Sequence, residues 1–160
     1  MENPTEKRNE KLAQKLIKNL NQRHYDAYYC KTSQDALDKA LQIIPQGSSV
    51  SWGGSATLNE IGLIKALKDG NYKVYDRENS ATQKEKRELS LKAFECDYYL
   101  SSVNAMSEDG VFVNIDGNGN RVAAITWGPE HVILVVGLNK ICQDVDAAIK
   151  RARSTAAPTN

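Results

Sequence analysis

Short apolar segments alternate with amphipathic segments along most of this chain, and that order constrains the fold more than any other feature. The segments predicted to be strands cover residues 25–30, 48–52, 72–75, 97–100 and 132–136. Strands that are separated by single helices pair through right-handed crossovers in a parallel sheet. The chain is therefore predicted to be an α/β protein with a three-layer, Rossmann-like, mainly parallel sheet.

The predicted helices cover residues 5–22, 33–44, 57–69, 81–95 and 144–154. Thr32 or Ser33 is expected to cap the second of them. Thr57 and Glu60 have the spacing of a capping box at the start of the third. The first helix has one apolar face, so it docks on another surface, which in a homodimer would be a second copy of the chain.

Residues 101–127 interrupt the alternation. Two apolar runs, residues 111–115 and 122–126, flank Asp-Gly and Asn-Gly dipeptides that favour a tight turn, so an inserted β-hairpin is predicted. Gly117 and Gly119 do not form a dinucleotide fingerprint, because a third glycine is missing and a strand is predicted to follow. The segment carries more polar residues than a hairpin needs: Asn104, Ser107, Glu108, Asp109, Asn114, Asp116, Asn120 and Arg121.

Ligands of open α/β sheets bind at the carboxyl ends of the strands. In this chain those ends include residues 53–55, 101–104 and 137–140, which are expected to converge on one edge. Gly53 and Gly54 either form an anion pocket before the predicted helix over 57–69 or only make a tight turn. The predicted ligand-binding residues are Gly53, Gly54, Ser55, Thr57, Asn104, Asn114, Asp116, Asn120, Arg121 and Lys140.

Glu108 and Asp109 are the candidate catalytic residues. Either carboxylate could be a general base or a nucleophile in a partly dry pocket, or both could be turn residues before Gly110. Arg121 could bind a substrate carboxylate or phosphate, and it could equally pair with Asp109 or Asp116 to hold the hairpin; the two roles are compatible. Trp52 and Trp127 flank the predicted pocket in sequence, and both are expected to be core residues.

Composition narrows the class of protein. The 160 residues suggest one domain, residues 1–160, with an amino-terminal helix over 5–22 and a core over 25–155, since domains usually span roughly 100–200 residues. A net charge of +1 and the lack of a long apolar run argue against nucleic-acid and membrane partners. No metal site is predicted, because His24, His131 and the three cysteines lack the spacing of metal ligands. The cysteines are few and scattered, so they are predicted to be reduced thiols, which indicates a cytoplasmic location.

Several segments together resemble one protein family. They are residues 102–124, 53–58, 60–62, 127–129, 137–140 and 156–160, in that family's order and spacing. On these residues the chain resembles the lactate-utilisation (LUD) domain proteins of bacteria from about Ser51 to its end.

The resemblance implies the fold superfamily of ribose-phosphate isomerases, glucosamine-phosphate deaminases, CoA transferases and folate cyclo-ligases. It also implies a part in oxidising L-lactate to pyruvate beside iron–sulfur partner subunits. Many relatives continue past the Ala-Ala-Pro segment, some with a cysteine-rich tail, so this chain is expected to be short or truncated. No cofactor is expected on this chain, and the clusters are expected on its partners.

Three functions remain open at this point. The first is a lactate-utilisation component that binds a small carboxylate or phosphate ligand at the strand edge. The second is a stand-alone isomerase, transferase or cyclo-ligase that acts on a sugar phosphate, CoA thioester or folate. The third is a non-catalytic sensor or scaffold that binds a metabolite. The family resemblance favours the first.

Overall fold

The computed structural model describes residues 3–159, so Met1, Glu2 and Asn160, the last residue of the 156–160 segment, lie outside the described residues. The chain divides into two compact units, which are described separately below. The sheet unit comprises Thr32–Ser102 and Asp116–Val135. The terminal unit comprises the described residues up to Lys31, then Val103–Ile115, and the described residues from Val136 on.

The sheet unit contains most of the predicted alternation. Its elements are α2 (Ser33–Ile43), β1 (Ser49–Trp52), α3 (Ala56–Glu60), α4 (Leu63–Asp69), β2 (Lys73–Tyr75), the 3-10 turn η1 (Arg77–Asn79), α5 (Gln83–Lys92), β3 (Tyr98–Ser101), α6 (Asn120–Thr126) and β6 (His131–Leu134). The strand order is β2-β1-β3-β6, and every neighbouring pair is parallel. The predicted α/β fold with a mainly parallel central sheet is confirmed.

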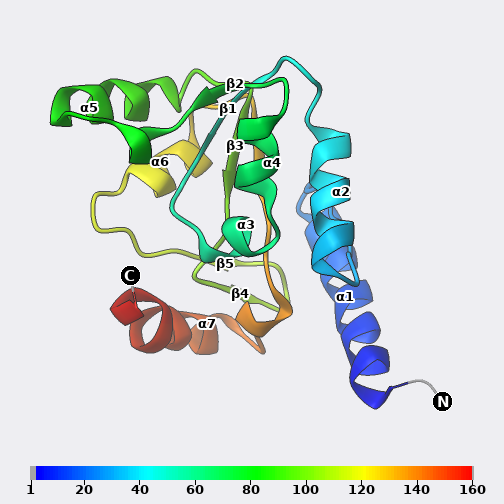
Figure 1. Ribbon diagram of the computed structural model, residues 1–160. Helices are drawn as coiled ribbons and strands as arrows, with labels where there is room; N and C mark the ends of the chain where they lie inside the picture. Colours follow the sequence, from blue (N-terminus) through cyan, green and yellow to red (C-terminus); the bar gives the residue numbers. More distant parts are fainter. Residues whose placement is uncertain (1–2, 160) are drawn as a thin grey trace. The chain divides into compact units, whose positions relative to one another are not determined.

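Helices cover both faces of this sheet, as Figure 1 shows. On one face, residues of α2, α3 and α4 pack on Val50, Trp52 and Leu100. On the other face, the residues that follow α5 and those of α6 pack on Tyr99 and Val132. The two faces follow from the alternation of side chains along β3, since Tyr99 and Leu100 point to opposite sides. The sheet unit is therefore three layers thick.

The terminal unit is built on a smaller sheet. Its elements are α1 (Pro4–Gln22), β4 (Ala105–Ser107), β5 (Phe112–Val113), the 3-10 turn η2 (Leu138–Lys140), β7 (Ile141–Cys142), α7 (Val145–Arg151), the π-helix η3 (Ala152–Ala156) and the 3-10 turn η4 (Ala157–Thr159). The strand order is β5-β4-β7, with β4 antiparallel to β5 and parallel to β7. The helix α7 packs against β4 and β7.

The predicted hairpin between residues 111–115 and 122–126 is wrong, because the second run forms the helix α6. Gly119 takes φ +70° just before this helix, and the Asp116 carboxylate accepts a hydrogen bond from the Val122 amide at 2.7 Å. A short apolar run fits a strand and a buried helix equally well, and these contacts select the helix. A helix, and not the predicted strand, therefore follows Gly117 and Gly119. The absence of a third glycine still argues against a dinucleotide fingerprint.

The hairpin of this chain lies one step earlier, between β4 and β5. Its turn contains Glu108, Asp109 and Gly110, and Gly110 takes φ +87°. The predicted strand over residues 25–30 is wrong, since this segment pairs with no strand among the described residues. Its Tyr25 ring packs edge-on against Phe112 of β5, with ring centroids 5.2 Å apart.

Two further expectations about the core need correction. Trp52 is buried as predicted, but Trp127 is 80% exposed and is not a core residue. The expected helix over residues 57–69 is split into α3 and α4 at Gly62, which takes φ +78°. The predicted capping box of Thr57 and Glu60 is wrong. The cap of α3 is Ser55, whose hydroxyl oxygen accepts a hydrogen bond from the Leu58 amide at 3.4 Å.

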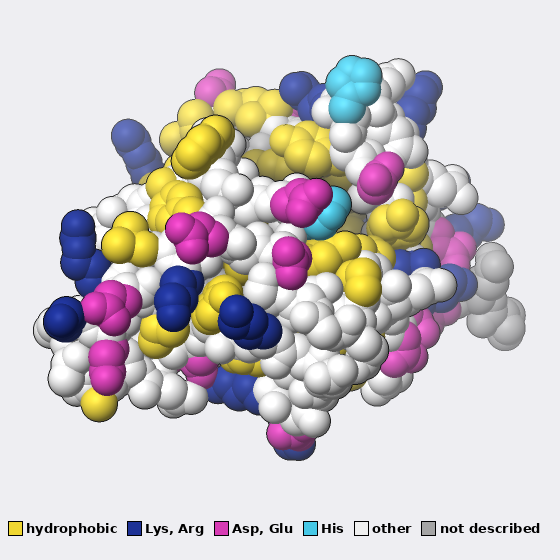
Figure 2. Space-filling model, turned by 90° about the horizontal axis from the view of Figure 1, so that it is seen from above, with side chains coloured by type: hydrophobic (Ala, Val, Ile, Leu, Met, Phe, Trp, Pro, Cys, Tyr) yellow, Lys and Arg dark blue, Asp and Glu magenta, His cyan; other side chains and the backbone are white. Residues whose placement is uncertain are grey.

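The surface carries both signs of charge. On the face in Figure 2, Lys and Arg side chains are interspersed with Asp and Glu side chains. Within residues 3–159, no helix has both the length and the apolar composition that crossing a bilayer requires.

Candidate functional site

The carboxyl ends of β1, β2 and β3 meet at one edge of the sheet unit, because the three strands are parallel. Gly53 follows β1, Arg77 lies just after β2, and Ser102 follows β3. In Figure 1 this is the end of the sheet at which β1 leads into α3. Within the sheet unit, the predicted edge therefore exists.

Gly53 is required at this edge for packing. Its amide donates a hydrogen bond to the Leu100 carbonyl at 3.0 Å, which continues the pairing of β1 with β3. A Cβ at Gly53 would lie 2.8 Å from Cγ of Arg121 and 2.9 Å from the Tyr99 hydroxyl oxygen. These distances are far below van der Waals contact, so glycine is needed for Arg121 and Tyr99 to approach the strand.

Arg121 is held at the same edge by Asp116. Its Nε and Nη2 each lie 2.7 Å from Oδ1 of Asp116, and its Nη1 donates to the Ser102 carbonyl at 2.9 Å. Both side chains are largely buried, with 12% of Arg121 and 9% of Asp116 exposed. Of the two aspartates predicted as partners of Arg121, Asp116 is the one that it contacts, and binding of a substrate by Arg121 stays a prediction.

The glycine loop offers less to an anion than its sequence suggested. The helix α3 that follows the loop has only five residues and ends at Glu60, so it has a short dipole. Gly54 is exposed, and a Cβ placed there would lie 3.9 Å from a carboxylate oxygen of Glu78. The anion-attracting groups of this edge are therefore side chains.

Two residues of the edge, Tyr99 and Arg77, were missed in the sequence. The Tyr99 side chain is 2% exposed, and burial raises the pKa of its hydroxyl to about 12, against the lowering effect of Arg77 and Arg121. Arg77 could have been found from the rule already applied, because it follows the carboxyl end of β2. Tyr99 gives no signal, because an aromatic residue inside a strand usually belongs to the core.

In the terminal unit, the β4–β5 turn is tied to α1. Lys15, Asn19 and Arg23 lie four residues apart on one side of the helix. Lys15 pairs with the Glu108 carboxylate at 2.5 Å, and Asn19 donates to the Glu108 carbonyl at 2.7 Å. Arg23 donates to the Asp109 carbonyl at 2.9 Å. Each of these side chains contacts the turn itself.

Asp109 has a second partner inside the turn. The Ser107 hydroxyl donates to the Asp109 carboxylate, and this bond, with a smaller contribution from Arg23, lowers the pKa of that carboxyl. Asp109 is therefore a stabilised anion and a weak general base. These contacts favour the turn-residue interpretation of Glu108 and Asp109, whose catalytic role remains a prediction.

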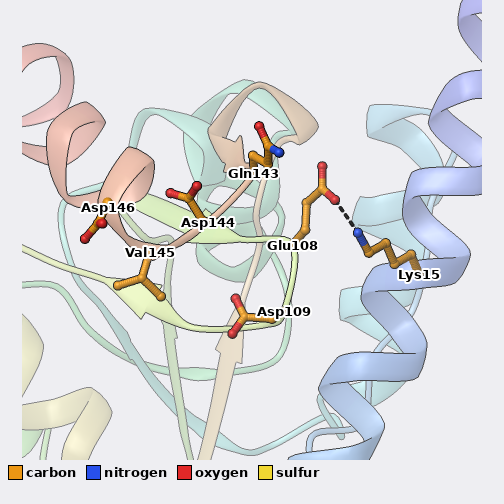
Figure 3. Close-up of a pocket in the computed structure, with 7 residues that line it drawn as sticks. All are labelled: Lys15, Glu108, Asp109, Gln143, Asp144, Val145 and Asp146. Atoms are coloured by element: carbon orange, nitrogen blue, oxygen red, sulfur yellow. Dashed lines mark hydrogen bonds and ion pairs between the residues drawn. The ribbon is translucent and has the colours of Figure 1, made fainter.

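A surface pocket of about 370 Å³ lies beside this turn (Figure 3). Its lining residues are Lys15, Glu108, Asp109, Gln143, Asp144, Val145 and Asp146. Figure 3 shows Glu108 pointing toward Lys15, whereas Asp109 projects elsewhere. Four carboxylates against one lysine repel anions, so this pocket does not suit the predicted anionic ligand.

Asn104 and Asn114 brace the β4–β5 hairpin. The Asn104 side-chain oxygen accepts the Ile115 amide at 2.8 Å, and the Asn114 side-chain oxygen accepts the Asn104 amide at 3.3 Å. Arg151 of α7 donates to the Asn104 carbonyl. This bracing accounts for part of the polarity that a hairpin alone does not need.

The predicted site residues fall in both units. The sheet unit holds Gly53, Gly54, Ser55, Thr57, Asp116, Asn120 and Arg121, and the terminal unit holds Asn104, Glu108, Asp109, Asn114 and Lys140. Within the sheet unit, Gly53, Asp116 and Arg121 come together around one guanidinium.

The cysteines of this chain do not fit an iron–sulfur cluster. Such clusters are usually held by four thiolates, and the chain has three cysteines. All three are free thiols, and burial raises the pKa of Cys96 to about 11. Across residues 3–159, no three His, Cys, Asp or Glu side chains are grouped as metal ligands.

Comparison with known proteins identifies a family. No curated protein and no solved structure matches the chain. The model of the LUD domain matches residues 13–160, which extends the resemblance seen in the sequence to nearly the whole chain. This chain therefore belongs to the LUD-domain family.

Proposed function

We propose that this chain is a component of bacterial L-lactate utilisation, the process with which the LUD domain is associated. In this proposal it acts with iron–sulfur partner subunits in the cytoplasm. Oxidation of L-lactate to pyruvate releases two electrons and two protons, and the partner clusters accept the electrons. The fold would then be that of the isomerase, deaminase and CoA-transferase superfamily.

The ligand of this chain, on the same proposal, is a small carboxylate or phosphate at the carboxyl edge of the sheet unit. The observation that carries the proposal is the placement of Arg121 against Gly53, where Asp116 fixes the guanidinium by two contacts of 2.7 Å. A preorganised guanidinium loses little entropy when a ligand binds beside it. The neighbouring Arg77 supplies a second positive charge to the same edge.

The function is tested by reconstitution. Pyruvate formation from L-lactate is measured with the purified iron–sulfur partner subunits, with and without this chain. The proposal expects the rate to depend on this chain. Equal rates with and without it, at matched partner concentrations, would contradict the proposal.

The ligand is tested by a thermal-shift panel on this chain alone. The panel contains lactate, pyruvate, inorganic phosphate, sugar phosphates, CoA, a reduced folate and nicotinamide cofactors. A ligand that binds only the folded protein raises the melting temperature by mass action. Stabilisation by lactate or pyruvate supports the lactate role, whereas stabilisation by CoA or folate alone would favour the stand-alone enzyme.

A further inference from the structure

The Tyr99 side chain is buried, but its hydroxyl group makes no hydrogen bond to the described residues. Its side chain is 2% exposed, and no donor or acceptor in residues 3–159 is bonded to the hydroxyl. Every fully buried side-chain nitrogen or oxygen in that part of the chain has a partner. The hydroxyl oxygen must therefore be the small part of Tyr99 that reaches the surface, beside Gly53 and Arg121.

Arg77 is the second group at this edge whose bonding capacity is unused. Its side chain is half-buried, and its charge acts on the Tyr99 hydroxyl more strongly than that of Arg121. Within the described residues, its guanidinium makes no ion pair and no hydrogen bond. Arg121, by contrast, is neutralised by Asp116 at 2.7 Å.

The other charges of the edge leave Arg77 as the main attraction for an anion. Asp76, the neighbour of Arg77, is neutralised by Lys68 at 2.6 Å. Glu78 is exposed, and water and salt screen its charge more than that of a half-buried group.

We propose that Arg77 and Tyr99 are the ligand-contacting groups of this edge: Arg77 pairs with an oxygen of a carboxylate or phosphate, and the Tyr99 hydroxyl donates a hydrogen bond to the same ligand. Arg121 is then a positioning residue, which holds the wall of the site through Asp116. This assignment rests on the proposed function, which places a small anion at this edge. It adds two residues that the sequence did not identify.

The chemistry of Tyr99 fits a donor. Burial raises the pKa of its hydroxyl to about 12, so the phenol keeps its proton at neutral pH. A neutral phenol beside a guanidinium matches an anionic oxygen, because both groups donate and neither repels.

The test compares two variants with two matched controls. Tyr99→Phe removes only the hydroxyl, and Arg77→Gln removes the charge. Tyr98→Phe makes the same change on the opposite face of β3, and Arg87→Gln makes the same change on the exposed side of α5. Pyruvate, acetate and inorganic phosphate are titrated into protein labelled with ¹³C at tyrosine Cζ, and the Tyr99→Phe spectrum identifies the Tyr99 signal.

We expect carboxylate or phosphate, but not both equally, to shift the Tyr99 signal. Each of Tyr99→Phe and Arg77→Gln should weaken that binding about tenfold or more, as expected for a lost charge-assisted hydrogen bond. The two control variants should bind as the wild type does.

Two outcomes would overturn the proposal, and they differ in what else they overturn. If an anion raises the melting temperature of the wild type and of both variants equally, the proposed anionic ligand stands and the assignment of Arg77 and Tyr99 fails. If no anion shifts the Tyr99 signal or the melting temperature at any anion concentration at which the protein stays in solution, the proposed anionic ligand and the assignment of Arg77 and Tyr99 both fail.

Discussion

Arg121 and Asp116 share one oxygen: the Nε and Nη2 atoms of the guanidinium both lie 2.7 Å from Oδ1 of the carboxylate. The other carboxylate oxygen accepts the Val122 amide, so one side chain holds both the arginine and the start of α6. Asp116→Ala would leave a largely buried guanidinium without its counter-charge. We expect a loss of about 3–5 kcal/mol in the free energy of unfolding.

Urea unfolding followed by tryptophan fluorescence measures this loss, because Trp52 and Trp127 both lie in the sheet unit. The control is Asp69→Ala, which removes an exposed partner of Lys65 in the same unit. Its effect should be much smaller, since exposed ion pairs contribute little. Equal effects of the two variants would show that Asp116 is no more than a surface charge.

Gly53 gives a second test of the packing around Arg121. In Gly53→Ala the new methyl group would meet Arg121 at 2.8 Å and Tyr99 at 2.9 Å, so one of them must move. We expect a loss of about 1–3 kcal/mol from this overpacking, measured by urea unfolding. Gly117→Ala is the control in the same unit, because no atom lies within 4 Å of its added Cβ. A Gly53→Ala protein as stable as Gly117→Ala would contradict the packing described here.

The parallel sheet could be predicted from the sequence because its short strand segments alternate with amphipathic helical segments and several are bounded by strong turn residues. The strand β1 and the turn at residues 45–47 before it are an example. The helix α6 could not be predicted, because its apolar run is too short for periodicity to distinguish a helix from a strand. The contact that favours the helix comes from Asp116, six residues before Val122. The wrong placement of the hairpin followed from that one error.

The candidate site was predictable only in part, for a similar reason. The rule about strand ends led to Gly53, and the surplus of polar residues in 101–127 led to Arg121, which the structure places close to Gly53. The rule did not lead to Tyr99, because the position of its hydroxyl beside Gly53 comes from the fold, which no pattern of residue types records. Trp127 was assigned to the core because it is a large apolar residue like Trp52, and it is exposed.

Asp97 predicts a dependence of stability on pH. Its carboxylate accepts hydrogen bonds from the amide of Ser49 at 2.7 Å and from its hydroxyl at 2.8 Å, and these bonds lower the pKa of Asp97, the amide most. The folded state therefore binds the proton less readily than the unfolded state, whose value is about 3.9. The stability that Asp97 contributes is present above that value and is lost as the pH falls through the folded pKa.

The measurement is urea unfolding of the wild type and of Asp97→Asn between neutral pH and pH 2. We expect the wild type to be more stable near pH 7 and the difference to shrink below about pH 4. The lowered pKa of Asp109 is present in both proteins, so its effect cancels in the difference. A difference that stays constant over the whole range would contradict a special role for Asp97.

Variants of Glu108 and Lys15 distinguish a catalytic role of Glu108 from a purely structural one, in which it holds the β4–β5 turn to α1. If Glu108 acts only through its contact with Lys15 at 2.5 Å, Glu108→Gln and Lys15→Met should lower the activity of the reconstituted lactate system by the same small factor. The pair is partly exposed, so either variant should cost less than about 1 kcal/mol in the free energy of unfolding. If Glu108 is a general base, Glu108→Gln should lose about 100-fold or more in rate. Lys15→Met would then keep most of the activity, and that split between the two variants would overturn the tethering interpretation of the turn.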